Sequence, residues 1–291
     1  MENEWLAKRF EEHRAHLRAV SYRMLGSVPE AEDAVQESWL RLSRADAKEI
    51  ENLAGWLTTV VARVCLNMLQ ARKTRREQPT GVHVPDPIVS LHDASDPEQE
   101  TLLADSVGLA LLVVLDTLNP AERLAFVLHD MFAVSFEEIG HIVGRSPTAA
   151  RQLASRARRR VRGQVPVSDP DLSRQREVVD AFLAAAREGD FEALLEVLDP
   201  DVVLRADRGA AEGSIEIIGA RAVARQAVAF SEVARFSRPA LVNGAAGLVT
   251  APGGEPFSVM GFTIRNGQIV EMDILADPER LGRLDLVILD D

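Results

Sequence analysis

Apolar residues recur every three or four positions through the first half of the chain, which is the spacing of one face of an α-helix. The pattern is clearest over 53–68, where it persists for four turns. It also predicts helices over 5–25, 28–42, 102–115 and 121–132. Gly26 ends the first helix, and Ser27 with Glu30 three residues later has the pattern of an N-terminal capping box.

The pattern changes after Asp171. Helical periodicity continues over 172–189 and 191–198, a strand is predicted at 201–207, and 215–230 is mostly helical. Four β-rich runs follow, at 240–243, 247–251, 257–264 and 268–275. Asn266-Gly267 between the last two is typical of a two-residue hairpin turn. Helices followed by an antiparallel meander predict an α+β domain whose helices cover one face of a curved sheet.

Two segments without periodicity divide the chain. Residues 79–98 contain four prolines, and 165–171 form a shorter break. We therefore expect a multidomain protein with all-α domains at 1–78 and 99–164 and an α+β domain at 172–291.

Residues 136–162 have the pattern of a helix-turn-helix. Gly140 and Gly144 suit a close crossing and a tight turn, Ser146 is a candidate N-cap, and Pro147 suits the first turn of a second helix. From 139 to 168 there are seven arginines and no acidic residue, which favours the major groove of DNA for the second helix. The alternative is a solvated, arginine-rich surface helix.

The charge of the chain is unevenly distributed. The net charge is −12, and residues 169–291 carry 12 arginines against 22 acidic residues. An acidic net charge predicts that the protein alone binds DNA weakly, and so that a partner supplies much of the affinity for DNA. The single cysteine, Cys65, excludes an intrachain disulfide framework and a cysteine-based zinc site. We expect no metal, no cofactor, no membrane span and no signal peptide, and hence a cytoplasmic protein.

Two long motifs carry a resemblance to a known family. YRMLGSVPEAEDAVQESWLRL (22–42) and AGWLTTVVARVCLNML (54–69) resemble the first domain of extracytoplasmic-function sigma factors, the promoter-recognition subunits of bacterial RNA polymerase. Residues 99–162 resemble the second sigma domain through TLNPAERLAFVLHDMFAVSFEEIGHIVGRSPTAARQLASRARRRV. The resemblance implies core RNA polymerase, through its β and β′ subunits, and promoter DNA as partners.

The resemblance also implies residue roles. The residues matching the helix that docks on polymerase are Asp33, Gln36, Glu37 and Leu40. Those matching the reader of the minus-ten element are Asn52, Arg63, Asn67, Arg72, Lys73, Arg75 and Arg76. Those matching the reader of the minus-thirty-five element are Arg145, Ser146, Thr148, Arg151, Gln152, Ser155, Arg156 and Arg159. A bidentate arginine–guanine contact in that last set would discriminate between bases by about 1–3 kcal/mol.

Residues 172–280 resemble a SnoaL-like domain, a cone-shaped α+β barrel with a pocket at its wide end. Its fusion to sigma domains resembles the SigJ-type subfamily, in which the C-terminal domain is implied to regulate the sigma part in cis. GVHVPDP (81–87) resembles the subfamily's WLPEP element, with His83 for tryptophan, and NGAAG (243–247) resembles its NGxPG element, with Ala246 for proline. The implied interdomain residues are His83, Val84, Pro85, Asp86, Asn243, Gly244 and Gly247.

Other functions remain open for the C-terminal domain. Asp207 and Asp273 lie on predicted strands and could face a pocket that binds a small ligand, or one could act as a general base. All six histidines lie at or before His141, which argues against catalysis in the barrel, so we expect no enzyme. The competing classes are a ligand-responsive DNA-binding regulator that is not a sigma subunit, and a SnoaL-type enzyme with a DNA-binding head.

Overall fold

The computed structural model describes residues 2–45, 50–75, 81–90, 107–164, 168–284 and 286. The chain forms two compact units. The first combines 1–78 with 114–164, and the second combines 79–113 with 165–291. This grouping differs from the expected three domains, because residues that we expected to be a linker pack with the C-terminal sheet. Helix α5 (Leu109–Asp116) contributes residues to both units.

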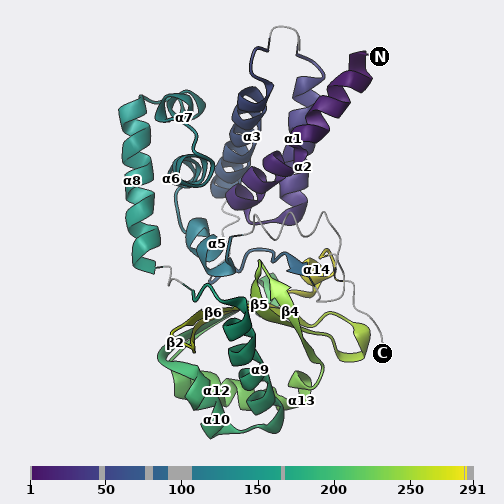
Figure 1. The fold of residues 1–291 in the computed structure, drawn as a ribbon, viewed down its shortest axis with the longest axis vertical. Coiled ribbons are helices and arrows are strands. Elements are labelled where there is room, and N and C mark those ends of the chain that lie inside the picture. The colour runs from purple at the N-terminus through teal and green to yellow at the C-terminus, as the bar shows by residue number, and fades with distance from the viewer. Residues whose placement is uncertain are drawn as a thin grey trace. The chain divides into compact units, whose positions relative to one another are not determined.

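The first unit is a bundle of helices (Figure 1). Its members are α1 (Glu2–Leu25), α2 (Val28–Leu42), α3 (Leu53–Arg75), α6 (Pro120–Phe126), α7 (Phe136–Val143) and α8 (Pro147–Gln164). Helices α1, α2 and α3 pack on one another, α8 packs on α6 and α7, and α3 contacts both α6 and α7. The helices of the two expected sigma domains therefore share one core.

Helix α3 runs through the centre of this core. Leu57, Val61 and Cys65 on its apolar stripe are fully buried, as the periodicity predicted. Its stretch Leu53–Thr74 is long and apolar enough to cross a membrane by length and composition alone, but half of its most apolar window is buried in the unit. A core helix of a helical bundle has these same properties.

Two local expectations for this unit are corrected. Ser27 precedes α2, but its side chain accepts no capping hydrogen bond, and the Glu30 side chain pairs with Arg72 of α3. The helix expected at 121–132 is interrupted: α6 ends at Phe126, and Val127–Met131 form a π-helical turn, η2. Residues 102–106 of the helix expected at 102–115 lie outside the described part of the chain.

The described part of the second unit contains a mixed sheet with the strand order β1-β4-β5-β6-β7-β2-β3. The strands are β1 (Val89–Ser90), β2 (Leu198–Asp207), β3 (Ser214–Ile218), β4 (Ser237–Val242), β5 (Ala245–Thr250), β6 (Ser258–Arg265) and β7 (Gln268–Leu275). Strands β2 and β7 run parallel, and every other pair is antiparallel. The chain enters this sheet first at β1, well before its C-terminal part.

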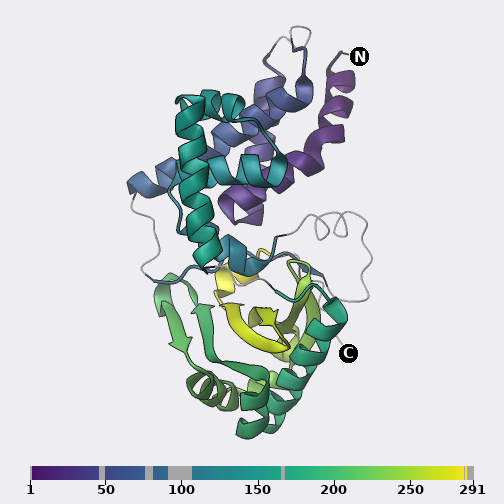
Figure 2. The same cartoon turned by 60° about the vertical axis from the view of Figure 1, so that its left-hand side comes forward.

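Helices α9 (Leu172–Glu188), α10 (Phe191–Val197) and α12 (Ala220–Ala229) pack on the sheet, which curls around them in Figure 2. Phe182, Leu194, Leu204 and Phe262 belong to the buried cluster between these two layers. Short helices α11 (Gly209–Glu212), α13 (Ser231–Ala234) and α14 (Pro278–Leu281) join the strands or follow the last one. The α+β plan expected from the sequence is thus confirmed.

One strand of this unit was not expected from the sequence, and one expected hairpin is present. Residues 214–218 form strand β3 instead of the expected helix, because their backbone pairs with β2. Gly219, with φ of 96°, then turns the chain into α12. The expected hairpin at Asn266-Gly267 is confirmed, with φ of 54° and 76°. Asn243-Gly244 forms the equivalent turn between β4 and β5, with φ of 50° and 77°.

Candidate nucleic-acid interface and linker clasp

The turn between α7 and α8 is built by local sequence. Ser135 and Glu138 form a reciprocal capping box at the start of α7, and Gly144 ends that helix at φ of 66°. A Cβ on Gly140 would lie 2.8 Å from the carbonyl oxygen of Arg145, so only glycine permits this close approach. Ser146 accepts a hydrogen bond from the backbone N–H of Ala149 at 3.2 Å and caps α8, as expected. The helix-turn-helix is therefore confirmed.

One side of α8 is exposed and the opposite side is buried. The buried side consists of Ala150, Leu153, Ala154 and Ala157. The exposed row, named here the α8 row, consists of Thr148, Arg151, Gln152, Ser155 and Arg159. Arg145 and Ser146 in the preceding turn are also exposed. The structure thus brings all eight residues expected for the minus-thirty-five element to the solvent, the eighth being Arg156, next to Ser155 on α8.

Carboxylates of the first unit hold the arginines beside this row. Glu122 of α6 lies 2.6 Å from Arg156 Nε and 3.7 Å from Arg160, and Asp130 lies 2.5 Å from Arg158 Nε. Burial alone would raise the pKa of Glu122, but the hydrogen bonds of Arg156 and Asn119 and the nearby positive charges lower it. Arg156, which we expected to contact DNA, is therefore paired within the protein. No pattern in the sequence pointed to Glu122.

The residues expected for the minus-ten element divide into two groups. Arg63, Asn67 and Lys73 are exposed along α3, but Arg63 donates to the carbonyl oxygen of His141 at 3.3 Å and Lys73 to Asn119 Oδ1 at 2.9 Å. The other group serves the fold. Asn52 caps α3 by accepting from the N–H of Gly55 at 3.0 Å, and Arg72 donates to the carbonyl oxygen of Leu25 at 3.3 Å. Arg76 and the side chain of Arg75 lie outside the described residues.

A buried arginine joins the two halves of the first unit. Arg123 of α6 is fully buried, donates from Nε to the carbonyl oxygen of Arg23 at 3.2 Å, and pairs with Asp116 at 2.8 Å. Burial lowers its pKa, and the Asp116 carboxylate opposes that effect. The Arg23 guanidinium in turn lies 4.7 Å from the ring centre of Phe132.

The residues expected to dock on polymerase share one side of α2. Asp33, Gln36 and Leu40 are exposed at helical spacing, and Leu40 is an exposed large apolar side chain. Glu37 is half-buried and pairs with Arg41 at 2.9 Å.

In the second unit, Asp207 binds the segment that begins at residue 81. Its Oδ2 accepts from the N–H of Val84 at 3.1 Å, from His83 Nδ1 at 3.0 Å and from Arg280 Nη1 at 2.8 Å. Its Oδ1 accepts from the N–H of Gly209 at 3.1 Å. Burial by itself would raise the pKa of Asp207, but the four donors lower it to about 2, so the carboxylate is charged.

Arg280 of α14 binds the same segment from the other side. Its Nε donates to Asp86 at 2.7 Å, and its Nη2 donates to the carbonyl oxygen of Val84 at 2.6 Å. Val84, Pro85 and Asp86 are all buried. The sequence pointed to the residues of this site separately, but nothing in it predicted the pairing of His83 with Asp207 or the role of Arg280.

Asn243 makes the third connection. Its N–H donates to the carbonyl oxygen of Ile88 at 2.8 Å, and its Oδ1 accepts from the N–H of Ile88 at 3.0 Å. Its Nδ2 donates to the carbonyl oxygen of Val107 at 3.1 Å. A Cβ on Gly247 would lie 2.4 Å from a Val242 methyl carbon and 2.6 Å from the carbonyl oxygen of Met260, so there is no room for a side chain at this position. We name the contacts of Asp207, Arg280 and Asn243 with residues 83–88 and 107 the linker clasp.

Asp273 occupies a separate, buried cluster of charges. Arg205 lies 3.2 Å from Asp273, 3.1 Å from Glu271 and 3.5 Å from Glu216. Burial and the neighbouring Glu271 raise the pKa of Asp273 to about 6, against the opposing effect of Arg205. An open hollow in this unit is lined by Leu195, Ile218, Arg221 and Arg225 among others, and neither Asp207 nor Asp273 lines it. That Asp207 or Asp273 faces a ligand pocket elsewhere in this unit stays a prediction.

Comparisons with known proteins match both halves of the first unit. Residues 9–76 match the family model for sigma-70 region 2, and residues 108–161 match that for sigma-70 region 4. The chain is 39% identical over 289 residues to "ECF RNA polymerase sigma factor SigJ" of Mycobacterium tuberculosis, covering 93% of this chain and 91% of the relative. It is 35% identical to the probable sigma factor SigI of the same species over 281 residues, covering 94% and 93%. The crystal structure of M. tuberculosis SigJ superposes with a TM-score of 0.78 at 36% identity, covering 96% of this chain and 99% of that one.

Proposed function

The chain belongs to the extracytoplasmic-function RNA polymerase sigma factors, and from that premise we propose how its surfaces share the work of promoter recognition. The α8 row reads the minus-thirty-five element. The exposed side of α3, with Arg63, Asn67 and Lys73, binds the minus-ten element. The exposed side of α2 docks on the β and β′ subunits of core polymerase in the cytoplasm. Support for this division comes from the position of each surface within a matched sigma region and from its exposure.

The C-terminal unit regulates this activity in cis through the linker clasp. The observation that carries the proposal is that one side chain, Asn243, binds both Ile88 and Val107. These residues are 19 positions apart and lie between the two matched sigma regions. Extended chain of that length could span about 60 Å at ~3.3 Å per residue. A closed clasp therefore shortens the reach between the two promoter-reading regions, and an open clasp restores it.

Contacts inside the first unit add a second requirement for opening. Arg63 and Lys73 donate to His141 and Asn119, which belong to the other sigma region. Two promoter elements that lie tens of base pairs apart on a duplex are tens of ångströms apart, because B-DNA rises 3.4 Å per base pair. Regions that pack on each other cannot reach both elements at once. We infer that α3 separates from α6 and α7 before promoter binding.

The clasp is tested with two matched substitutions at two matched turns. Asn243→Gly removes the clasp side chain at a backbone φ of 50° that glycine tolerates, and Asn266→Gly makes the same change at φ of 54° in the other hairpin. Loss of the two side-chain hydrogen bonds, at about 1 kcal/mol each, shifts the clasp equilibrium by roughly 30-fold toward the open form. We expect Asn243→Gly with core polymerase to transcribe from promoters with lengthened spacers that the unchanged protein uses poorly.

The readout is transcript yield in vitro from a promoter series that differs only in spacer length. Asn266→Gly should keep the spacer preference of the unchanged protein. If the two variants behave alike, the clasp does not set the reach. Yield on the optimal spacer reports sigma activity separately from this regulation.

We further infer that the C-terminal unit is not an enzyme. Asp207 is charged and fully engaged by the clasp, and Asp273 is buried against Arg205. His83 does reach Asp207, but it is supplied by the linker segment and its Nδ1 is taken up by that contact. A small ligand of this unit would act by shifting the clasp equilibrium.

A further inference from the structure

One arginine of the α8 row differs from its basic neighbours in what holds it. The guanidinium carbon of Arg151 lies 5.1 Å from the centre of the Phe136 ring. Arg156, Arg158 and Arg160 are instead held by carboxylates. Phe136 is the first residue of α7, and Arg151 is the fifth residue of α8. An aromatic side chain of the first helix of the helix-turn-helix thus makes a cation–π contact with an arginine of the second helix.

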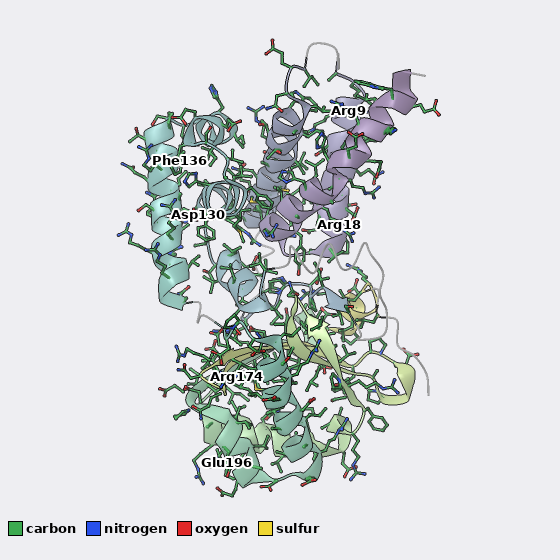
Figure 3. All side chains as sticks on the ribbon, viewed as in Figure 1. Arg9, Arg18, Asp130, Phe136, Arg174 and Glu196 are labelled. Atoms are coloured by element: carbon green, nitrogen blue, oxygen red, sulfur yellow. The ribbon has the colours of Figure 1, made fainter. Side chains whose placement is uncertain are left out.

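Phe136 is itself held in place by the segment before α7. The His129 ring stacks on it with centres 3.9 Å apart and an angle of 28° between the planes. His129 Nδ1 lies 2.9 Å from the carbonyl oxygen of Val134, and because a carbonyl can only accept, Nδ1 carries a hydrogen. The π-helical turn at 127–131 and the left-handed Ala133, with φ of 54°, shape the segment that supports this stack. Figure 3 labels Asp130 on this segment and Phe136 at the start of α7.

A ring contact restrains an arginine without consuming its donors. The positive guanidinium is attracted to the face of the ring, while its five N–H groups project from the edge of its own plane. A carboxylate partner, in contrast, occupies those N–H groups. Arg151 is therefore oriented and still able to make the bidentate contact to O6 and N7 of guanine that arginine prefers in the major groove. It lies near the N-terminus of α8, the part of a recognition helix that meets base edges.

We propose that Phe136 is a positioning residue that sets the specificity of Arg151 for one guanine of the minus-thirty-five element. This inference rests on the proposed assignment of α8 as the reader of that element. Phe136 does not touch the base. It limits the rotamers of Arg151 to those that present the guanidinium edge to the groove, and His129 stiffens the platform.

The test measures base preference with the full-length chain bound to core polymerase. Promoters carrying each single base-pair change in the minus-thirty-five element are compared by transcript yield at limiting holoenzyme. Arg151→Ala should abolish the preference at one guanine, a loss of roughly 5- to 150-fold in discrimination. Phe136→Leu should lower the preference at that same base pair by about 3- to 10-fold and leave the other positions unchanged. Phe136→Tyr retains an aromatic face and should retain the preference.

A double-substitution cycle separates this role from a structural one. In the Arg151→Ala background, Phe136→Leu should have no further effect on base preference. Thermal unfolding checks that each variant is folded, and Phe136→Met provides a second non-aromatic side chain if leucine is not tolerated. Equal loss at every base pair, or an unchanged profile in the folded non-aromatic variant while Arg151→Ala flattens it, would overturn the inference. No effect of Arg151→Ala at any position would overturn it too, and would show that the assignment of Arg151 as a base reader had failed first.

Discussion

Arg280 and Asp207 form an ion pair within the second unit, with Nη1 of Arg280 2.8 Å from Oδ2 of Asp207. The two residues are 73 positions apart, and the same guanidinium also reaches Asp86 and the carbonyl oxygen of Val84. Strand β2 and helix α14 are thereby tied to the segment that joins the two sigma regions. The pair is the centre of the linker clasp.

Removing the Arg280 guanidinium should therefore open the clasp and destabilise the second unit. Arg280→Met keeps the length of the side chain but leaves the carboxylates of Asp207 and Asp86 without their cation. Breaking a buried pair costs about 3–5 kcal/mol, and because Arg280 is 17% exposed we expect about 2–3 kcal/mol from urea unfolding.

Arg283→Met is the matched control for this change. Arg283 follows α14 by two residues and pairs with Glu279, but both side chains are more than half exposed. An exposed pair contributes about 0–1 kcal/mol, so this variant should unfold near the unchanged protein. Equal destabilisation by the two variants would contradict the central role of Arg280. Hydrogen exchange at the backbone N–H of Val84 should accelerate only in Arg280→Met.

Adjacent arginines of α8 test which side of the helix meets DNA. Arg159 lies in the exposed α8 row, and Arg158 is paired with Asp130 at 2.5 Å. Arg159→Ala should weaken promoter binding by the holoenzyme and lower the slope of log affinity against log salt by about 0.9, the loss of one phosphate contact. Arg158→Ala should change that slope much less. Fluorescence anisotropy across a salt series measures both, and a larger effect of Arg158→Ala would place the DNA on the other side of α8.

Local patterns predicted much of this fold because the responsible interactions are local. The turn at Gly144, the cap at Ser146 and the hairpin at Asn266-Gly267 each depend on a few neighbouring residues, and all three are confirmed. Strand β3 was missed because its strand conformation depends on pairing with β2, a tertiary contact that overrides local preference. The Glu30 half of the capping box expected at Ser27 fails for the same kind of reason, since the Glu30 side chain pairs with Arg72 of α3.

The candidate site shows the same division. The exposed positions of the α8 row follow from helical periodicity, so their placement could be predicted. The linker clasp could be anticipated only as two motifs, because Arg280 and Asp86 are 194 positions apart and no local signal joins them. The engagement of Arg156 by Glu122 was also beyond the sequence, since it depends on how α6 packs against α8.

The buried carboxyl group of Asp273 should make stability depend on pH in a direction opposite to that of Asp207. The pKa of Asp273 is raised to about 6 in the folded protein, so its protonated form is favoured by folding. Its stabilising contribution is fully present below the ordinary carboxyl pKa of about 3.9 and is lost as the pH rises through about 6. For Asp207, whose pKa is lowered to about 2, the contribution is present above about 3.9 and is lost as the pH falls through about 2.

The variant Asp273→Asn isolates this effect because it keeps the shape of the side chain and cannot ionise. Between pH 4 and pH 7, the free energy of unfolding of the unchanged protein should fall relative to that of Asp273→Asn. A shift of about two pKa units corresponds to a change of about 2–3 kcal/mol across that range. Urea unfolding at several pH values measures the difference, and carboxyl titration by NMR gives the pKa directly. A difference that stays constant with pH would mean that Arg205 holds the Asp273 carboxylate charged throughout, and that burial does not dominate this cluster.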